Sequence, residues 1–202
     1  MKRVVLVCFL LVPFLWTCAS TSQTVKWEYE KDAVELHLKA DKQLNYKDKK
    51  AHALVICAYQ LMSPNAFEQL SGSRDGLYKL LECLVFDPAS VAVSKQIVAN
   101  PGKNMVVKLD RAEGAKYVAL VAGYYTIDRA KITRLYKIPE ISVRSGFLWL
   151  KKTYKPGPLT VDLVLGARQL QDPAPSEEDQ TSKDTKTEKS ADPTAPTKRR
   201  DY

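Results

Sequence analysis

The sequence has few of the residues from which enzymes build metal and nucleophile sites. Among its 202 residues there are only 2 histidines and 4 cysteines. His37 and His52 have no partner at ligand spacing, and the motifs C-x-x-C, H-E-x-x-H and G-x-S-x-G and a glycine-rich phosphate loop are missing. We therefore expect no catalytic residue and no metal site. Carboxylates that converge only in the fold remain an alternative route to a hydrolase.

The sequence also lacks an apolar run that could span a bilayer, which takes roughly 20 residues. The apolar segment from Val4 to Trp16 has about 13 residues and follows the basic start Met1-Lys2-Arg3, as in a secretory signal peptide. We assign residues 1–17 to a signal peptide.

The end of this segment, Leu15-Trp16-Thr17-Cys18, resembles the lipobox of bacterial lipoproteins. The resemblance implies covalent diacylglycerol and N-acyl lipid on Cys18, with no other cofactor, and Ala19 in place of aspartate implies sorting to the outer membrane. Thr17-Cys18-Ala19 also fits ordinary cleavage after Ala19, so simple secretion stays open. Both alternatives place the mature chain outside the cytoplasm, with residues 18–24 as a flexible polar tether.

Two cysteines remain beyond the signal and the lipidation site. Cys57 lies in an apolar strand pattern and Cys83 in an apolar helix pattern. In an oxidising compartment they can form a disulfide, and two buried free thiols are the alternative.

Charge is spread along the chain rather than concentrated. The formal net charge is +8, with basic and acidic residues interspersed, which is typical of a solvated surface and not of a nucleic-acid site. Residues 171–202 are rich in proline and charge and poor in aliphatic side chains. We expect this tail to be disordered.

Between the tether and the tail, apolar residues recur at a spacing of two, the period of half-buried strands. The segment from Tyr117 to Ile127 is nearly continuously apolar and predicts a central strand buried on both faces. The other predicted strands are Val25–Tyr29, Ala33–Ala40, Ala51–Leu61, Met105–Leu109, Ile132–Ile138, Phe147–Leu150 and Leu159–Leu165.

One interval, near residues 63–86, has helical spacing instead. Ser63-Pro64 and Asp75 are candidate helix starts, and leucines 77, 80, 81 and 84 form a stripe. Seven or eight strands with one short helical insertion predict a mainly β, two-sheet sandwich over residues 25–170.

The segment Asp41 to Lys50 joins two predicted strands and is longer than a hairpin needs. A long loop with an apolar and an aromatic residue among lysines is often a recognition element, so Leu44 and Tyr46 are the candidate contacts. The alternative is that Leu44 packs onto the sandwich edge and the lysines are only solvated.

Several short motifs then follow one another in a recognisable order behind the lipobox. They include Trp27-Glu28-Tyr29-Glu30, Ile56-Cys57-Ala58-Tyr59-Gln60-Leu61, Asn65-Ala66-Phe67, Asp75-Gly76-Leu77, Asp110-Arg111-Ala112 and Val121-Ala122-Gly123-Tyr124-Tyr125. Over roughly residues 18 to 170 this order resembles the TssJ family, the outer-membrane lipoproteins of the bacterial type VI secretion system.

The resemblance implies a transthyretin-like β-sandwich, lipid-anchored at the outer membrane and facing the periplasm, that docks the periplasmic C-terminal region of the inner-membrane protein TssM. In this family the loop between the first two strands contacts TssM. By position the contacts here are Asp41, Lys42, Gln43, Leu44, Asn45, Tyr46 and Lys47. Such an adaptor is no enzyme and needs no nucleic acid or small-molecule substrate. A periplasmic sandwich lipoprotein that binds a small ligand or peptide is the alternative.

Overall fold

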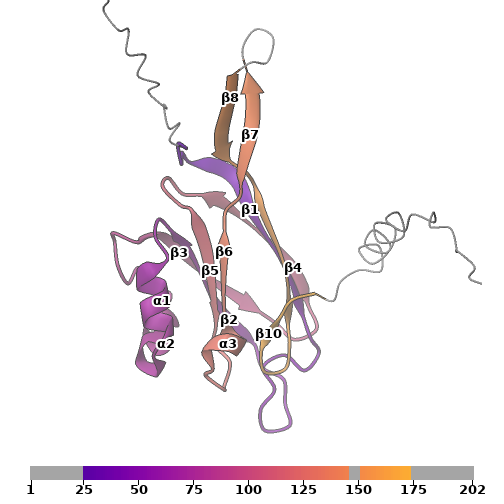
Figure 1. Cartoon of the computed structure of the whole chain (residues 1–202). Helices are drawn as coiled ribbons and strands as arrows, with labels where there is room; N and C mark the ends of the chain where they lie inside the picture. Colours follow the sequence, from indigo (N-terminus) through magenta and orange to yellow (C-terminus); the bar gives the residue numbers. More distant parts are fainter. Residues whose placement is uncertain (1–24, 146–150, 174–202) are drawn as a thin grey trace, which may run out of the picture.

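The structure, a computed structural model, describes residues 25–145 and 151–173. Two four-stranded sheets pack face to face, with strand orders β10-β9-β1-β4 and β3-β2-β5-β6, and a two-stranded hairpin of β7 and β8 extends from one end (Figure 1). The two-sheet sandwich predicted from the sequence is confirmed. The predicted signal peptide, Cys18 with its tether, the predicted strand Phe147–Leu150 and the tail from residue 174 onward lie outside the described residues.

Ten strands and three helices are found in the described part of the chain. The strands are β1 (Glu30–Ala40), β2 (Leu54–Leu61), β3 (Val91–Ala99), β4 (Asn104–Arg111), β5 (Tyr117–Ala122), β6 (Thr133–Lys137), β7 (Glu140–Ser145), β8 (Lys151–Pro156), β9 (Leu159–Leu165) and β10 (Leu170–Gln171). The helices are α1 (Asn65–Ser71), α2 (Arg74–Leu80) and α3 (Arg129–Ile132).

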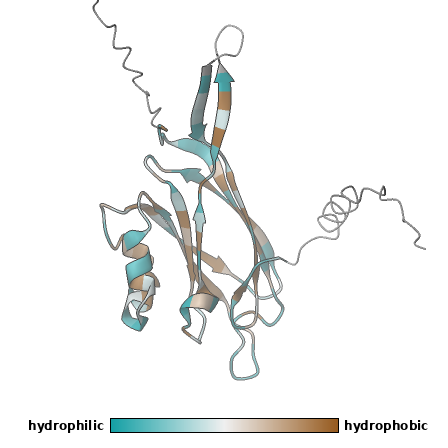
Figure 2. Ribbon diagram, in the orientation of Figure 1, coloured by the Kyte–Doolittle hydropathy of each residue, from teal (hydrophilic) through white to brown (hydrophobic). Residues whose placement is uncertain are grey.

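The first sheet is built on the predicted alternation. In β1, Val34, Leu36 and Leu38 are buried while Glu35 and His37 face outward. β1 pairs in parallel with β9 and antiparallel with β4, so two strands distant in sequence flank it. One face of this sheet therefore forms the core, and the other carries Glu35 and His37. Both hydrophilic and hydrophobic residues occur along the strands of the sandwich (Figure 2).

The second sheet is buried on both faces at its centre. Every residue of β5 from Val118 to Ala122 has no exposed surface, which confirms the predicted central strand. One face of the sheet meets the first sheet, and α1 and α2 lie beside β2 and β3 (Figure 1). Tyr59 of β2 points toward the helices, where its hydroxyl donates to Leu80 O, and burial raises its pKa to about 12.

The helical insertion lies within the predicted interval, but both of its caps differ from the prediction. Pro64, and not Ser63, is the N-cap of α1, and no side chain caps this helix. The side chain of Ser73 accepts a hydrogen bond of 3.1 Å from Gly76 N, so Ser73 caps α2 and Asp75 lies in its first turn. The prediction of Asp75 as the cap is wrong. A Cβ on Gly76 would stand 2.0 Å from Leu70 O, so only glycine allows α1 and α2 to approach this closely.

A disulfide joins Cys57 of β2 to Cys83, with a Cα–Cα distance of 5.0 Å. The sequence left open whether these two cysteines form a disulfide or remain buried free thiols, and the structure has the disulfide. Cys83 has a φ of 57° and follows the end of α2 at Leu80, so the chain leaves the helical path there. The prediction that Leu84 continues the helical leucine stripe is therefore wrong, and Leu84 is 64% exposed.

Four strands were not predicted, namely β3, β7, β8 and β10, and among the described residues one predicted strand is absent. Val25–Tyr29 forms no strand; instead Trp27 O accepts a hydrogen bond of 2.7 Å from Gly114 N, and Trp27 packs on the core. In β10, Gln171 pairs with Val164, so the fold continues past the predicted domain end at residue 170. Within the described ranges no helix is both long and apolar enough to cross a membrane.

Candidate docking site

The loop that joins β1 to β2, residues 41–53, lies at the opposite end of the sandwich from the hairpin (Figure 1). Asp41 N donates to Leu165 O at 2.9 Å, and Tyr46 N donates to Ala167 O at 2.8 Å. The backbone of the loop is therefore held by the end of β9 and by the segment that follows it.

The first turn of the loop directs Leu44 into the core. Leu44 N donates to Asp41 O at 3.1 Å, and Gln43 N donates to Asp41 Oδ1 at 2.7 Å, which reverses the chain. The Leu44 side chain is fully buried. The prediction that it is an exposed contact is wrong, because burying a leucine side chain is favoured by roughly 1.5–3 kcal/mol over exposing it.

Asn45 is buried as well, with 6% of its surface exposed and a φ of 47°. Its Nδ2 donates to Ala53 O at 3.2 Å, and its Oδ1 accepts from Tyr125 N at 3.1 Å. The prediction of Asn45 as an exposed contact is therefore wrong too. Asparagine tolerates this left-handed backbone conformation, and here its side chain fastens the loop to the segment after β5.

Residues 47–50 form the tip of the loop, and all four side chains are exposed. Lys47 and Lys50 exchange two backbone hydrogen bonds of 2.9 Å, while Asp48 and Lys49 have φ values of 50° and 61°. Positive φ at both central residues is typical of a type I′ turn, the tight connection of a β-hairpin. The tip therefore presents three lysines and one aspartate on a short turn.

Tyr125 completes the exposed surface beside this tip. Its ring is 52% exposed, Lys47 Nζ lies 4.5 Å from the ring centroid, and the His52 ring meets it edge-on at 5.2 Å. The prediction that Tyr125 lies within a buried strand is wrong, because β5 ends at Ala122. The signal that could have revealed it is Gly123, which follows the apolar run and allows the chain to turn.

We call the resulting surface the docking hollow. It has a volume of about 630 Å³ and is lined by Tyr46, Lys47, Asp48, Lys49, Tyr125, Thr126 and Arg168. It combines two aromatic side chains with an excess of positive charge. Such a surface suits an acidic protein segment that also carries an apolar or aromatic side chain.

Two carboxyl groups among the described residues have a clearly shifted pKa, and both shifts are downward. A catalytic acid needs a carboxyl group with a raised pKa. Here the hydrogen bond from Tyr29 lowers the pKa of Asp110, and the hydrogen bond from Ser90 lowers the pKa of Asp87. Nor do three or more His, Cys, Asp or Glu side chains gather as a metal site in the part of the chain that the structure describes.

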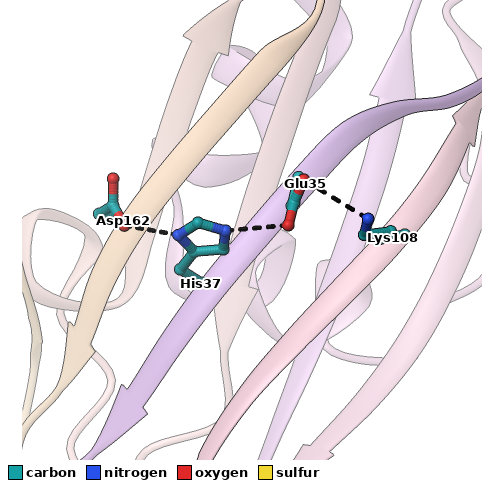
Figure 3. A network of polar contacts seen from close by, with 4 residues as sticks. All are labelled: Glu35, His37, Lys108 and Asp162. Atoms are coloured by element: carbon teal, nitrogen blue, oxygen red, sulfur yellow. Dashed lines mark hydrogen bonds and ion pairs between the residues drawn. The ribbon is translucent and has the colours of Figure 1, made fainter.

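A polar network lies on the outer face of the first sheet (Figure 3). His37 Nδ1 is 2.9 Å from Asp162 Oδ1, His37 Nε2 is 3.1 Å from Glu35 Oε1, and Lys108 Nζ is 4.0 Å from Glu35 Oε2. A neutral imidazole has only one N–H, so both contacts are hydrogen bonds only when the ring is protonated. The hydrogen bonds with Glu35 and Asp162 raise the pKa of His37.

Protonated His37 is expected to stabilise the wild-type chain relative to a His37→Gln variant. This advantage in thermal stability should be lost as the pH rises from about 6.5 through the raised pKa of His37. The folded state binds this proton more tightly than the unfolded state, so the contribution is complete below about pH 6.5 and lost above the folded-state pKa. The effect is modest because the His37 side chain is 41% exposed. Tm measured for both chains across this pH range tests it, and a constant difference between them would contradict it.

A family model of type VI secretion lipoproteins, described under the names VasD, EvfM and TssJ, matches residues 32–163. The chain belongs to the TssJ family of type VI secretion lipoproteins. The matched range begins two residues after the start of β1 and ends within β9. It includes the loop 41–53, the whole second sheet and most of the first sheet, but not β10.

Several solved structures are similar to this TssJ-family chain, and one of them, with a TM-score of 0.50, shares its fold. Lip from Serratia marcescens, described as a membrane-bound component of the type VI secretion system, is 19% identical with a TM-score of 0.50, over 71% of this chain and 98% of that one. The lipoprotein TssJ1 from Pseudomonas aeruginosa is 20% identical with a TM-score of 0.49, over 73% of this chain and 98% of that one. A structure described as the TssM C-terminal domain (869–1107) from EAEC is 14% identical with a TM-score of 0.49, over 70% of this chain and 98% of that one. No curated protein matches by sequence.

In this TssJ-family chain, the predicted contact residues thus divide into two groups. Asp41, Lys42, Gln43 and Lys47 are exposed and Tyr46 is partly exposed, whereas Leu44 and Asn45 belong to the interior. Tyr125 and Arg168 join the first group from elsewhere in the chain.

Proposed function

We propose that this chain is a lipid-anchored adaptor of the type VI secretion membrane complex. It is held to the outer membrane through acyl chains on Cys18 and binds the periplasmic C-terminal region of a TssM-like inner-membrane protein through the docking hollow. The role is structural and not catalytic. The observation that carries the proposal is the family match over residues 32–163.

The course of β1 supports a protein with two functional ends. The strand starts at Glu30, shortly after the tether, and ends at Ala40, where the loop 41–53 begins. Eleven residues in a strand extend over about 36 Å. An anchor at one end and a binding loop at the other would thus face opposite directions, as an adaptor between two membranes requires.

The composition of the docking hollow supports a protein partner. Tyr46 and Tyr125 supply rigid aromatic area, and the surrounding cations favour association with an acidic surface. Because Leu44 and Asn45 hold the loop from within, the loop backbone has little conformational freedom to lose on binding.

Replacing Tyr125 with alanine is expected to weaken binding to the purified periplasmic region of the cognate TssM-like protein by about tenfold or more, since buried aromatic contacts dominate interface energies. Affinity measured by biolayer interferometry tests this. Lys47→Glu should lower the association rate in particular, and high salt should reduce the difference.

The matched control is Tyr78→Ala on α2. Tyr78 is 49% exposed and also lies near a cation, with Arg74 Cζ 6.0 Å from the ring centroid, but it is outside the hollow. Its replacement should leave the affinity unchanged. Wild-type affinity in a folded Tyr125→Ala chain would assign the TssM contact to another surface.

A further inference from the structure

The β7–β8 hairpin stands apart from the sandwich (Figure 1). It forms a sheet of only two strands, paired from Glu140 opposite Pro156 to Ser145 opposite Lys151. Two-stranded hairpins are marginally stable in water when nothing packs on them. We therefore expect a hairpin that extends from a domain in this way to be stabilised by a binding partner.

The charges of the hairpin would repel one another in free solution. Arg144 lies directly opposite Lys152, and like charges at such a position destabilise a strand pair. Lys155 adds to the positive charge, and Glu140 is the only acidic residue of the two strands. A polyanionic surface would remove this repulsion.

Apolar side chains accompany the charges. Ile141 is 38% exposed and Tyr154 is 45% exposed, and Lys152 Nζ lies 5.1 Å from the centroid of the Tyr154 ring. Tyrosine and lysine together are typical of surfaces that lie at the headgroup level of a bilayer.

The base of the hairpin and the start of the chain's folded part are fixed to the same buried side chain. Arg111 is 3% exposed; its Nη1 donates to Gly157 O at 3.4 Å, its Nη2 donates to Glu28 O at 3.1 Å, and Nη2 is 2.9 Å from Glu30 Oε2. Gly157 directly follows β8, and Gly157 N donates to Pro139 O at 2.7 Å just before β7. The hairpin and the segment that leads to the tether thus leave the sandwich at one end.

The maximum length of the tether is similar to the length of the hairpin. From Cys18 to Val25 the chain spans at most about 25 Å. Six residues in each strand give the hairpin a length of about 20 Å. With acyl chains on Cys18 inserted in a bilayer, the hairpin end of the sandwich would stay within reach of the headgroups.

From these observations we infer that the β7–β8 hairpin is a second membrane contact, which binds the anionic phospholipid headgroups of the bilayer that holds the lipid anchor. The contact residues lie on both faces of the hairpin: Arg144, Lys152 and Tyr154 on one face, and Ile141 and Lys155 on the other. The inference rests on the anchoring part of the proposed function. It adds an orientation: the hairpin faces the bilayer, and the docking hollow faces away from it.

The test uses the full chain carrying Cys18→Ser, so that acyl chains do not mask the weaker contact. It should co-sediment with vesicles in which about one lipid in four is phosphatidylglycerol and the rest phosphatidylcholine, and not with phosphatidylcholine alone. Adding Arg144→Gln, Lys152→Gln and Lys155→Gln should lower the bound fraction at a given lipid concentration by about tenfold. The same number of changes elsewhere, Lys39→Gln, Lys79→Gln and Lys103→Gln, should leave binding near that of the parent.

Equal binding by the hairpin variant and the parent, or no binding of the parent to anionic vesicles, would overturn the inference. So would loss of affinity for the TssM-like partner in the hairpin variant without vesicles, since the hairpin would then be a protein contact. Circular dichroism establishes that each variant is folded. If Tyr125→Ala leaves partner affinity intact while the hairpin variant loses vesicle binding, the docking proposal fails and the membrane contact stands.

Discussion

Leu44→Ala is expected to lower the free energy of unfolding by roughly 2–5 kcal/mol, the usual effect of truncating a buried leucine. Leu44 has no exposed surface and lies in the core cluster, although it belongs to the loop of the docking hollow. Removing its side chain leaves a cavity beneath the loop. Urea denaturation followed by tryptophan fluorescence or circular dichroism measures the change.

Leu84→Ala is the matched control for this substitution. The same side-chain atoms are removed, but Leu84 is 64% exposed, so the free energy of unfolding should change by no more than about 0.5 kcal/mol. If Leu44→Ala unfolds like the wild type and yet loses partner affinity, Leu44 is a contact residue and our assignment to the core is wrong.

Loss of the disulfide is the second large effect. Replacing both Cys57 and Cys83 with alanine is expected to lower the free energy of unfolding by about 3.5 kcal/mol, from the chain-entropy model for a sequence separation of 26 residues. The disulfide closes the segment that contains α1 and α2 onto β2, so without it the unfolded chain gains conformational freedom. Thermal unfolding with and without reductant measures the change.

The wild-type chain and the double variant act as controls for each other. Reductant should lower the Tm of the wild-type chain toward that of the double variant and leave the double variant unaffected. Thiol labelling establishes that the wild-type disulfide is fully reduced. If the Tm of the reduced wild-type chain is then unchanged, the disulfide does not stabilise the fold. A disulfide between these two cysteines also agrees with export to an oxidising compartment.

Strands with a buried and an exposed face were the best predicted parts of the fold. β9 has the predicted bounds, Leu159 to Leu165, and β1 contains the predicted Ala33–Ala40, because period-two alternation reflects burial of one face. β3 was missed because it is an edge strand with Val93 and Val98 exposed at 40% and 48%, which obscures the alternation. Val25–Tyr29 has strand composition but hydrogen-bonds to a turn instead of a neighbouring strand.

The end of α2 illustrates a tertiary constraint that overrides a local pattern. Leucines 77, 80, 81 and 84 would continue one helical face. The disulfide to Cys57 draws Cys83 out of that path, with a φ that no α-helix has. Periodicity reports only what neighbouring residues favour, so it could not place the helix end.

The sequence alone was sufficient for the class of fold, the central buried strand, the helical insertion, the position of the long loop between β1 and β2 and the family. These depend on local alternation and on the order of motifs along the chain. The tertiary structure decided which loop residues face solvent. Leu44 and Asn45 turn inward because the core and Tyr125 N provide their partners, and Tyr125 and Arg168 come from distant segments to line the docking hollow. Burial and contacts between distant segments arise only once the two sheets have packed, and no local pattern encodes them.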